Sequence, residues 1–209
     1  MPFRRSIAYS ASEDRLQKLI EERLREGANK KEVDQRIWDL FGETWCVMVT
    51  DLVGFSRGVE DFGIVHFLQT IFESERILVP IAERNDGILL KMDGDSFLVV
   101  FRNPKKGLRA ALEMQEAAMH YSLERDAEEK VLLSIGLGYG LVLRIGDADV
   151  FGGEVNSAFV LGEDTAGGHE ILMTRAMRDA IGTVDGYDFV EVTATKAGTS
   201  GAFMLTKIS

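Results

Sequence analysis

Two aspartates stand where the chain turns between apolar segments. Asp51 ends an apolar run that begins at Trp45, directly before a glycine-containing turn, and Asp95 lies in the tight turn Asp93-Gly94-Asp95 between two further apolar runs. Carboxylates of this kind hold Mg²⁺, and the backbone N–H groups of a glycine-containing turn can hold phosphate. Two carboxylates brought together by neighbouring strands would form a two-metal site for in-line phosphoryl displacement. Each aspartate taken alone is equally typical of an ordinary turn.

The hydrophobic pattern predicts the elements that must position these aspartates. Pro80 is expected to kink or interrupt the helix that contains it. The order β-α-β-β-α-β-β, followed by further helices and strands, favours an α+β fold in which helices cover one face of a mainly antiparallel, ferredoxin-like sheet. We expect strands over residues 45–50, 88–92, 96–101, 131–139, 141–145, 170–173, 187–192 and 202–206, and helices over 60–85, 104–125, 154–165 and 175–181.

A charged leader precedes this pattern. Residues 12–42 carry apolar side chains at helical spacing in two segments, with Ser12 as the expected N-cap and a break at residues 27–29. We interpret residues 1–43 as a helical extension packed on its own domain, residues 44–209. A dimerisation or signal-input element is the alternative interpretation.

Composition narrows the function classes. The 209 residues carry a formal net charge of -10, which argues against a nucleic-acid binder because such proteins present basic surfaces. The single cysteine, Cys46, excludes an intrachain disulfide. The start of the chain lacks the apolar core of a secretory signal, and no apolar run approaches the ~20 residues of a membrane span. We therefore expect a cytoplasmic protein without a membrane partner.

Three segments together are similar to a known family. VMVTDLVGF (residues 47–55), KMDGDSFLVVF (91–101) and DVFGGEVN (149–156) occur in the order, and at about the spacing, of the motifs of class III adenylate and guanylate cyclases. The chain thus resembles this family over roughly residues 45–208. The turn DGDSF is superficially similar to that of diguanylate cyclases, but that alternative leaves residues 149–156 unexplained.

The resemblance implies a role for each matching residue. Asp51, Asp95 and the main-chain carbonyl of Leu52 match the ligands of two Mg²⁺ or Mn²⁺ ions. The turn formed by Val53, Gly54, Phe55 and Ser56 matches the phosphate cradle. Lys91 and Asp149 match the pair that reads the nucleobase, and Asn156 matches the residue that orients the ribose. The family divides these residues between two subunits, so the resemblance implies a homodimer with the nucleotide at the interface.

The base-reading pair favours adenine. Lysine donates to a ring nitrogen and a carboxylate accepts from the exocyclic amine, whereas guanine presents a carbonyl where adenine has its amine. The resemblance therefore predicts an enzyme that converts ATP into 3′,5′-cyclic AMP and pyrophosphate. A cyclase for GTP or a pyrimidine triphosphate is an alternative.

One departure from the family keeps a non-enzymatic alternative open. Four residues after Asn156 the family places an arginine that stabilises charge on the transferring phosphate, and here that position is Val160. Losing one preorganised contact of this kind costs on the order of 10²–10³ in rate. Arg144 and Lys196 are candidate replacements, and Arg144 is preferred because its strand pair adjoins Asp149. Without a replacement we expect slow turnover, and the alternative function is then that of a catalytically impaired, cyclase-like dimeric module that binds nucleotide or regulates.

Overall fold

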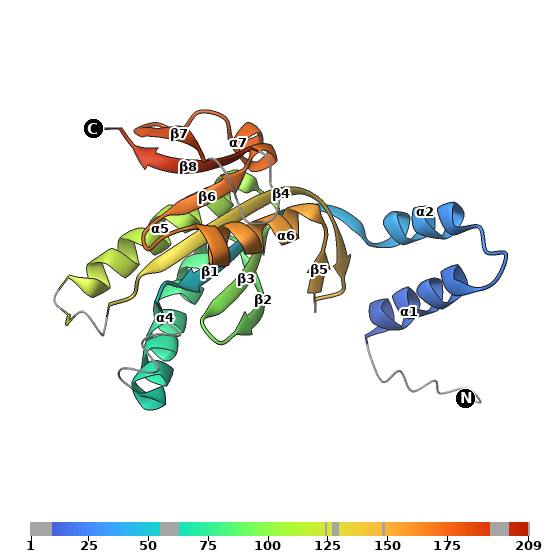
Figure 1. Cartoon of the computed structure of the whole chain (residues 1–209), viewed down its shortest axis with the longest axis horizontal. Coiled ribbons are helices and arrows are strands. Elements are labelled where there is room, and N and C mark those ends of the chain that lie inside the picture. The colour runs from blue at the N-terminus through green and yellow to red at the C-terminus, as the bar shows by residue number, and fades with distance from the viewer. Residues whose placement is uncertain are drawn as a thin grey trace.

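The computed structural model describes residues 10–54, 63–123, 125–126, 130–147, 149–192 and 201–208. Eight strands in these ranges form one sheet, in the order β2-β3-β1-β4-β6-β8-β7 with β5 paired to β4 (Figure 1). The strands are β1 (Gly42–Leu52), β2 (Ile88–Asp93), β3 (Ser96–Phe101), β4 (Leu133–Ile145), β5 (Asp149–Phe151), β6 (Ile171–Thr174), β7 (Tyr187–Val192) and β8 (Ala202–Lys207).

Helices flank the sheet and precede it. They are α1 (Ala11–Leu24), α2 (Lys30–Phe41), α4 (Ile64–Arg84), α5 (Pro104–Ser122), α6 (Gly153–Phe159), the π-helix η2 (Val160–Thr165) and α7 (Arg175–Ile181). None of the helices within the described ranges combines the length and apolar character needed to cross a bilayer.

The strands β2, β3, β1 and β4 form the predicted ferredoxin-like core. β1 lies at its centre and pairs antiparallel with both β3 and β4. β6 joins the other edge of β4 in parallel, and the β7–β8 hairpin extends the sheet beyond it. The predicted α+β architecture with a mainly antiparallel sheet is therefore confirmed.

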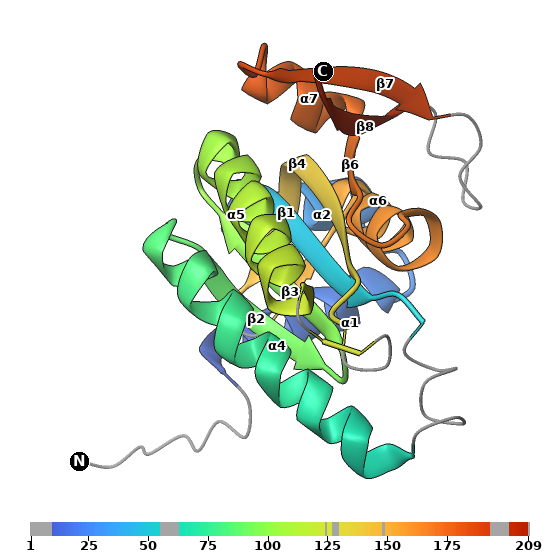
Figure 2. The ribbon, with the colours of Figure 1, turned by 90° about the vertical axis from the view of Figure 1, so that its left-hand side faces the viewer.

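The helices cover both faces of the sheet, which corrects the prediction that they cover one. Figure 2 shows α4 and α5 on one side of the sheet and α6 on the other. The first face buries Met48, Phe101 and Leu137 against α4, α5 and α7. The second face buries Trp45, Val47, Val49 and Leu98 together with Val155 and Ala158 of α6. Both layers are apolar, which gives the sheet a core on each side.

Glycines in β4 explain why a helix can rest on the second face. A Cβ atom at Gly136 would lie 2.1 Å from the carbonyl oxygen of Ala158, and one at Gly138 would lie 2.3 Å from that of Glu154. The backbone of α6 therefore sits directly on the backbone of β4. A periodicity of apolar residues cannot reveal such a layer, because the contact is made by residues without side chains.

Three local predictions were wrong. The N-cap of α1 is Ser10 rather than Ser12, because Ser10 and Glu13 form a reciprocal capping box. The predicted strands at 131–139 and 141–145 are one strand, β4, which runs through Gly140. The helix expected over 154–165 consists of two parts, because the α-helical winding of α6 ends at Phe159 and the π-helix η2 follows it.

Helix α4 continues past the exposed Pro80 without the predicted interruption. The expected start of this helix, at residue 60, lies outside the described residues.

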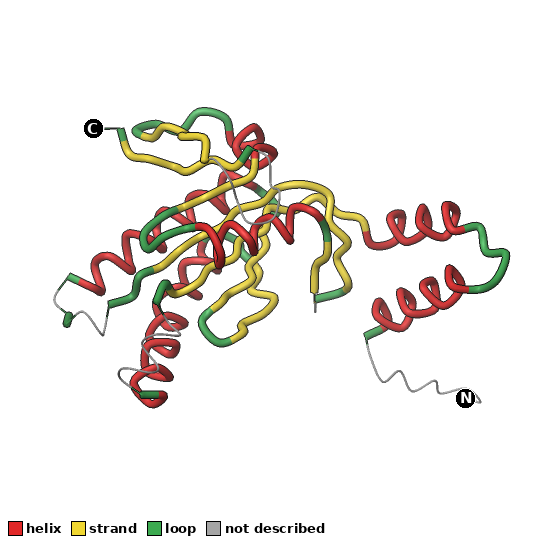
Figure 3. The backbone as a smooth tube through the Cα atoms, in the orientation of Figure 1, coloured by secondary structure: helices red, strands yellow, loops and turns green. Residues whose placement is uncertain are grey.

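The two N-terminal helices form a hairpin that packs on the end of β4. Leu19, Val33, Ile37 and Phe41 bury their side chains together with Ile145 of that strand. In Figure 3 this hairpin projects from the strands, and β1 begins directly after α2. The extension thus packs on the domain that follows it, while its role and the division at residue 43 stay predictions.

The close approach of α6 and β4 makes a stability prediction. Gly136→Ala places a methyl group into the backbone of α6 and should lower the free energy of unfolding by at least about 2 kcal/mol. Gly153→Ala is the control, because a Cβ there meets no atom within 4 Å. Urea unfolding of both variants measures the difference. Equal stability of the two variants would show that α6 does not rest on β4.

Candidate functional site

The two sequence-predicted aspartates meet at one end of the sheet. Asp51 lies near the end of β1, and Asp95 lies in the turn that enters β3. The antiparallel register pairs Thr50 with Phe97, which sets Asp51 and Asp95 on adjacent strand ends. Their carboxyl groups lie within hydrogen-bonding reach of each other. Strand pairing thus brings together two residues that are 44 positions apart in the sequence.

The contact between the carboxyl groups is electrostatically unfavourable. Burial raises the pKa of Asp51, although hydrogen bonds from Ser96 and Asp95 oppose that shift. Burial and the negative charge of Asp51 raise the pKa of Asp95 to about 6. Two half-buried carboxylates in contact resist being charged together. A shared proton or a bound cation relieves this repulsion.

The donor atoms here fit a small hard cation. Mg²⁺ binds through one or two protein carboxylates and takes its remaining oxygens from water and substrate phosphates. The half-buried carboxylates of Asp51 and Asp95 match that requirement for protein carboxylates. No group of three or more His, Cys, Asp or Glu side chains suited to a metal occurs in the described part of the chain. The site therefore fits a metal that arrives with a phosphate ligand better than a metal enclosed by protein.

Two residues that sequence reasoning missed adjoin the aspartates. The Ser96 hydroxyl lies 3.3 Å from Oδ1 of Asp51 and 2.9 Å from Oε1 of Glu163. Glu163 belongs to the π-helix η2, at its approach to the end of β1. Burial, followed by the negative charge of Asp51, raises the pKa of Glu163. No sequence pattern indicated this role for Glu163, because in a regular α-helix the side chain three residues after Val160 would point in another direction.

The turn after Asp51 is only partly described. The N–H of Val53 donates to the carbonyl of Leu132 at 2.9 Å, so that group is engaged within the protein. Gly54 has a φ of 88°, the left-handed conformation that glycine adopts without strain. Phe55 and Ser56, the other predicted members of the phosphate cradle, lie outside the described residues.

Lys91 and Asp149 form the predicted pair. Nζ of Lys91 lies 3.1 Å from Oδ2 of Asp149, which joins β2 to β5 across 58 positions of sequence. Oδ1 of the same carboxylate accepts from the N–H of Val150 at 2.9 Å. Lys91 keeps half of its side-chain surface exposed. The pair is thus assembled within one chain and stays open to solvent.

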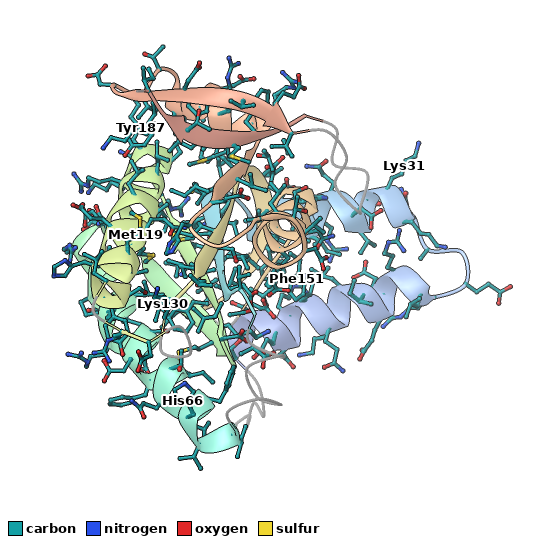
Figure 4. All side chains as sticks on the ribbon, turned by 60° about the vertical axis from the view of Figure 1, so that its left-hand side comes forward. Lys31, His66, Met119, Lys130, Phe151 and Tyr187 are labelled. Atoms are coloured by element: carbon teal, nitrogen blue, oxygen red, sulfur yellow. The ribbon has the colours of Figure 1, made fainter. Side chains whose placement is uncertain are left out.

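A pocket of about 520 Å³ lies beside Asp149, between α1 and β5. Leu16, Ile20 and Phe151 supply its apolar wall. Figure 4 shows Phe151 near α1, where the N-terminal hairpin meets the domain. The hairpin therefore borders the predicted base-reading pair.

Asn156 and Val160 both belong to the layer formed by α6 and η2. Asn156 lies in α6 with its side chain exposed, and Val160 is the first residue of η2 and is half-buried. Neither residue contacts Asp51 through a hydrogen bond that the structure records among its described residues.

Arg144, the preferred substitute for the missing arginine, lies far from Asp51 in the same chain. Asp51 pairs with Ser134, and Arg144 follows ten residues later on β4, a strand distance of roughly 30 Å. Its guanidinium stacks on the Trp45 ring at 4.6 Å and contacts Asp147 at 2.8 Å. Arg144 therefore cannot reach phosphates held at Asp51 of its own chain. It could meet only the phosphates of a nucleotide held at Asp51 of another subunit. Lys196 lies outside the described residues.

Comparison with known sequences gives two partial matches, and no family model matches the chain. A segment of 131 residues, 63% of this chain, is 26% identical to the serine/threonine-protein kinase pkn2 of Myxococcus xanthus. A segment of 114 residues, 54% of this chain, is 27% identical to "Putative adenylate cyclase 3" of Rhizobium meliloti strain 1021. The matches span 16% and 19% of those proteins, so the chain corresponds to less than a fifth of each.

Solved structures match over most of the chain. The adenylate/guanylate cyclase/hydrolase from Silicibacter pomeroyi superimposes with a TM-score of 0.66 and 22% identity, over 80% of this chain and 98% of that one. The catalytic core of a rhodopsin–guanylyl cyclase with converted specificity, in complex with ATPαS, gives 0.68 and 18% over 79% and 96%. The guanylate cyclase domain of RhGC from Catenaria anguillulae, in complex with GTP, gives 0.66 and 17% over 80% and 98%.

The chain has the class III nucleotidyl cyclase fold. This confirms the resemblance that the three sequence motifs indicated. Identities of 17–22% establish a shared fold. The activity of this cyclase-fold protein has to be argued from its own residues, of which Asp51 and Asp95 are the most informative.

The raised pKa of Asp95 predicts how stability depends on pH. Its carboxyl titrates at about 6 in the folded chain and near 3.8 when unfolded, so the cost of ionising it in the fold is absent below about pH 4 and complete above about pH 6. Asp95→Asn removes that cost. After allowance for solvent screening, the variant should gain on the order of 1 kcal/mol at about pH 7.5 and nothing at about pH 4.

Thermal unfolding at the two pH values tests this expectation. Asp93→Asn, an exposed change in the same turn, is the control and should alter stability little at either pH. A gain for Asp95→Asn that is equal at both pH values would mean that repulsion between the carboxylates is not its source.

Proposed function

We propose that the protein is a nucleotidyl cyclase that converts ATP into 3′,5′-cyclic AMP and pyrophosphate at the interface of a homodimer. The observation that carries the proposal is the contact between Asp51 and Asp95 at the end of two paired strands within a class III cyclase fold. The Lys91–Asp149 pair, joined at 3.1 Å, supports it independently.

The proposed reaction is an intramolecular phosphoryl displacement. The ribose 3′-oxygen bonds to the α-phosphorus, the bond from that phosphorus to the β-phosphate oxygen breaks, and the hydroxyl proton passes to solvent as pyrophosphate leaves. Two divalent cations, when bound, would lower the barrier by stabilising the attacking and leaving oxygens. The chain itself contributes mainly positioning and fixed charge.

Asp51, Asp95 and the Leu52 carbonyl would hold the cations in this proposal. The same oxygen set anchors the triphosphate, because Mg²⁺ takes part of its coordination from phosphate oxygens. Gly54 offers a backbone N–H next to the phosphates, and its left-handed conformation permits the sharp turn there. Binding of nucleotide and of metal would consequently depend on each other.

Lys91, Asp149 and Asn156 would hold the nucleoside. Nζ of Lys91 can donate to a ring nitrogen of adenine, and the Asp149 carboxylate can accept from the exocyclic amine. Their present ion pair at 3.1 Å would have to exchange partly for contacts to the base. The Lys91 side chain is 50% exposed and that of Asp149 29%, and partly exposed ion pairs contribute about 1 kcal/mol or less, so the exchange costs little. Asn156, exposed on α6, would orient the ribose.

A homodimer follows from the division of these residues. The family resemblance places the metal ligands and the nucleoside contacts of one site on opposite subunits. The strand distance of roughly 30 Å keeps Arg144 from Asp51 of its own chain, so a role for Arg144 at the phosphates would require a second subunit. In the proposed dimer Arg144 would approach the phosphates from the partner.

A nucleotide-binding module without turnover is the second candidate function. The observation that favours it is Val160, a half-buried apolar side chain at the junction of α6 and η2 where the family has a cation. The intact Asp51–Asp95 and Lys91–Asp149 pairs favour the enzyme. A cyclase for GTP or a pyrimidine triphosphate is a variant of the first proposal.

Incubation with nucleotides tests the proposed activity. The purified chain with Mn²⁺ and each of the four ribonucleoside triphosphates should form a cyclic product from ATP, detected by chromatography. Asp51→Asn should abolish the product while circular dichroism shows an unchanged fold, because Asp51 lies at a strand end. Cyclisation of GTP but not ATP would overturn the assigned substrate, and binding of Mn-ATP without any cyclic product would favour the module.

Two substitutions decide how charge on the transferring phosphate is stabilised. If Arg144 serves that role, Arg144→Ala should lower kcat on the order of 10²-fold with a smaller change in KM, because the contact acts on charge that develops in the transition state. Arg102→Ala is the matched control, because Arg102 stacks on the same Trp45 ring at 4.0 Å. Both variants lose a stacking contact, so a drop confined to Arg144→Ala reports catalysis.

The Val160→Arg variant tests the alternative case, in which no other cation replaces the family arginine. In that case the wild type turns over slowly and Val160→Arg raises kcat more than it changes KM. If Arg144 fills the role, the added arginine brings no gain and disturbs the packing of the half-buried position. Steady-state kinetics of the wild type and both variants separate the two cases.

A further inference from the structure

The π-helix η2 brings a third acidic residue to the metal end of the sheet. Gly162 makes this approach possible, since a Cβ there would lie 2.8 Å from the carbonyl oxygen of Val49 and 3.0 Å from the N–H nitrogen of Gly136. The wide π-turn is closed by the Thr165 hydroxyl, which donates to the Val160 carbonyl at 2.8 Å. Glu163 is thereby set opposite Ser96, next to Asp51.

Ser96 stands between two carboxylates but has one hydroxyl proton. It lies 2.9 Å from Oε1 of Glu163 and 3.3 Å from Oδ1 of Asp51. A hydroxyl donates one hydrogen bond and keeps two lone pairs as acceptors. The two carboxylates compete for that proton, and the shorter contact favours Glu163 as its acceptor. While Glu163 holds the proton, the hydrogen bond to Asp51 is given up and the Ser96 oxygen turns its lone pairs toward Asp51.

We propose that Glu163 is a positioning residue of the metal site, which holds the Ser96 hydroxyl so that Ser96 and Asp51 both present lone pairs to a divalent cation. The inference rests on the proposed function, because it presumes a cation at Asp51 and Asp95. Without Glu163, the Ser96 proton would point to Asp51 and compete with the cation for that carboxylate.

The physical reason for the effect is twofold. A hydrogen bond from Ser96 to Asp51 has to be broken before a cation can use the same oxygen, and Glu163 takes over that proton in advance. Glu163 also adds a negative charge close to the cation. Residues that orient metal ligands in this way commonly alter metal affinity by 10–100-fold when they are changed.

Direct measurement of Mn²⁺ binding tests the inference without relying on turnover. Free Mn²⁺ is followed by its electron paramagnetic resonance signal during titration of the full chain with the metal alone. Glu163→Ala should weaken Mn²⁺ binding about tenfold. Glu163→Gln keeps an acceptor oxygen for Ser96 and should recover part of that loss. Asp164→Ala, a change of the exposed neighbouring acid, is the control and should bind Mn²⁺ like the wild type.

A double-mutant cycle shows whether Glu163 acts through Ser96. Adding Glu163→Ala to Ser96→Ala should weaken Mn²⁺ binding much less than Glu163→Ala weakens it in the wild type, because only the charge of Glu163, and no longer its hold on Ser96, is then lost. Additive losses would overturn the proposed route through Ser96, and wild-type affinity of Glu163→Ala would overturn the role of Glu163 altogether.

The same titration separates this inference from the proposed function. Asp51→Asn and Asp95→Asn should each weaken Mn²⁺ binding severely if the metal site is correctly assigned. If they do so while Glu163→Ala binds normally, the metal site stands and the role of Glu163 falls. If both aspartate variants bind Mn²⁺ like the wild type, the metal site itself is wrong and the proposed function fails with it.

Discussion

The contact between Asp51 and Asp95 is the constraint on which the rest of the site depends. Pairing of β1 with β3 forces two half-buried carboxylates together and raises the pKa of Asp95 to about 6. A fold keeps such a repulsive pair when the rest of the structure over-determines it, and here the buried register from Cys46 to Thr50 does so. In the proposed mechanism, a bound cation would offset this repulsion. Strain of this kind marks functional sites more often than structural ones.

The segment on the second face of the sheet, α6 with η2, carries two residues of the candidate site. The glycines of β4 let α6 and η2 lie directly on the strands, so one continuous segment carries the exposed Asn156 at one end and Glu163 beside Asp51 at the other. Val160 lies at the junction of the two helices, where the winding changes from α to π. Loss of the family arginine and the change of helix type thus occur at the same point.

The strands were predicted from the sequence more accurately than the placement of the helices on the two faces of the sheet. Apolar alternation and the motifs around Asp51, Asp95 and Asp149 were sufficient for the ferredoxin-like core, because local pattern and strand pairing agree there. Two features depended on backbone contacts that leave no apolar signal: the packing of α6 on Gly136 and Gly138, and the π-turn that turns Glu163 to Ser96. Ser10 was missed as the cap because α1 begins at Ala11, five residues before Leu16, the first residue of the apolar repeat. The pairing of Lys91 with Asp149 was expected from the family alone, since no short-range pattern links β2 to β5.

The central claim is that one chain carries two half-sites, a metal end at Asp51 and Asp95 and a nucleoside end at Lys91 and Asp149, which are completed only between subunits. Mixing two inactive variants measures this directly. The Asp51→Ala and Lys91→Ala variants are unfolded together and refolded as an equal mixture. About half of the dimers would then pair one variant with the other, and each mixed dimer would contain one intact site out of two. The mixture should therefore regain about a quarter of the wild-type rate of ATP cyclisation. Each variant refolded alone should stay inactive. A mixture as inactive as its components would contradict the shared site.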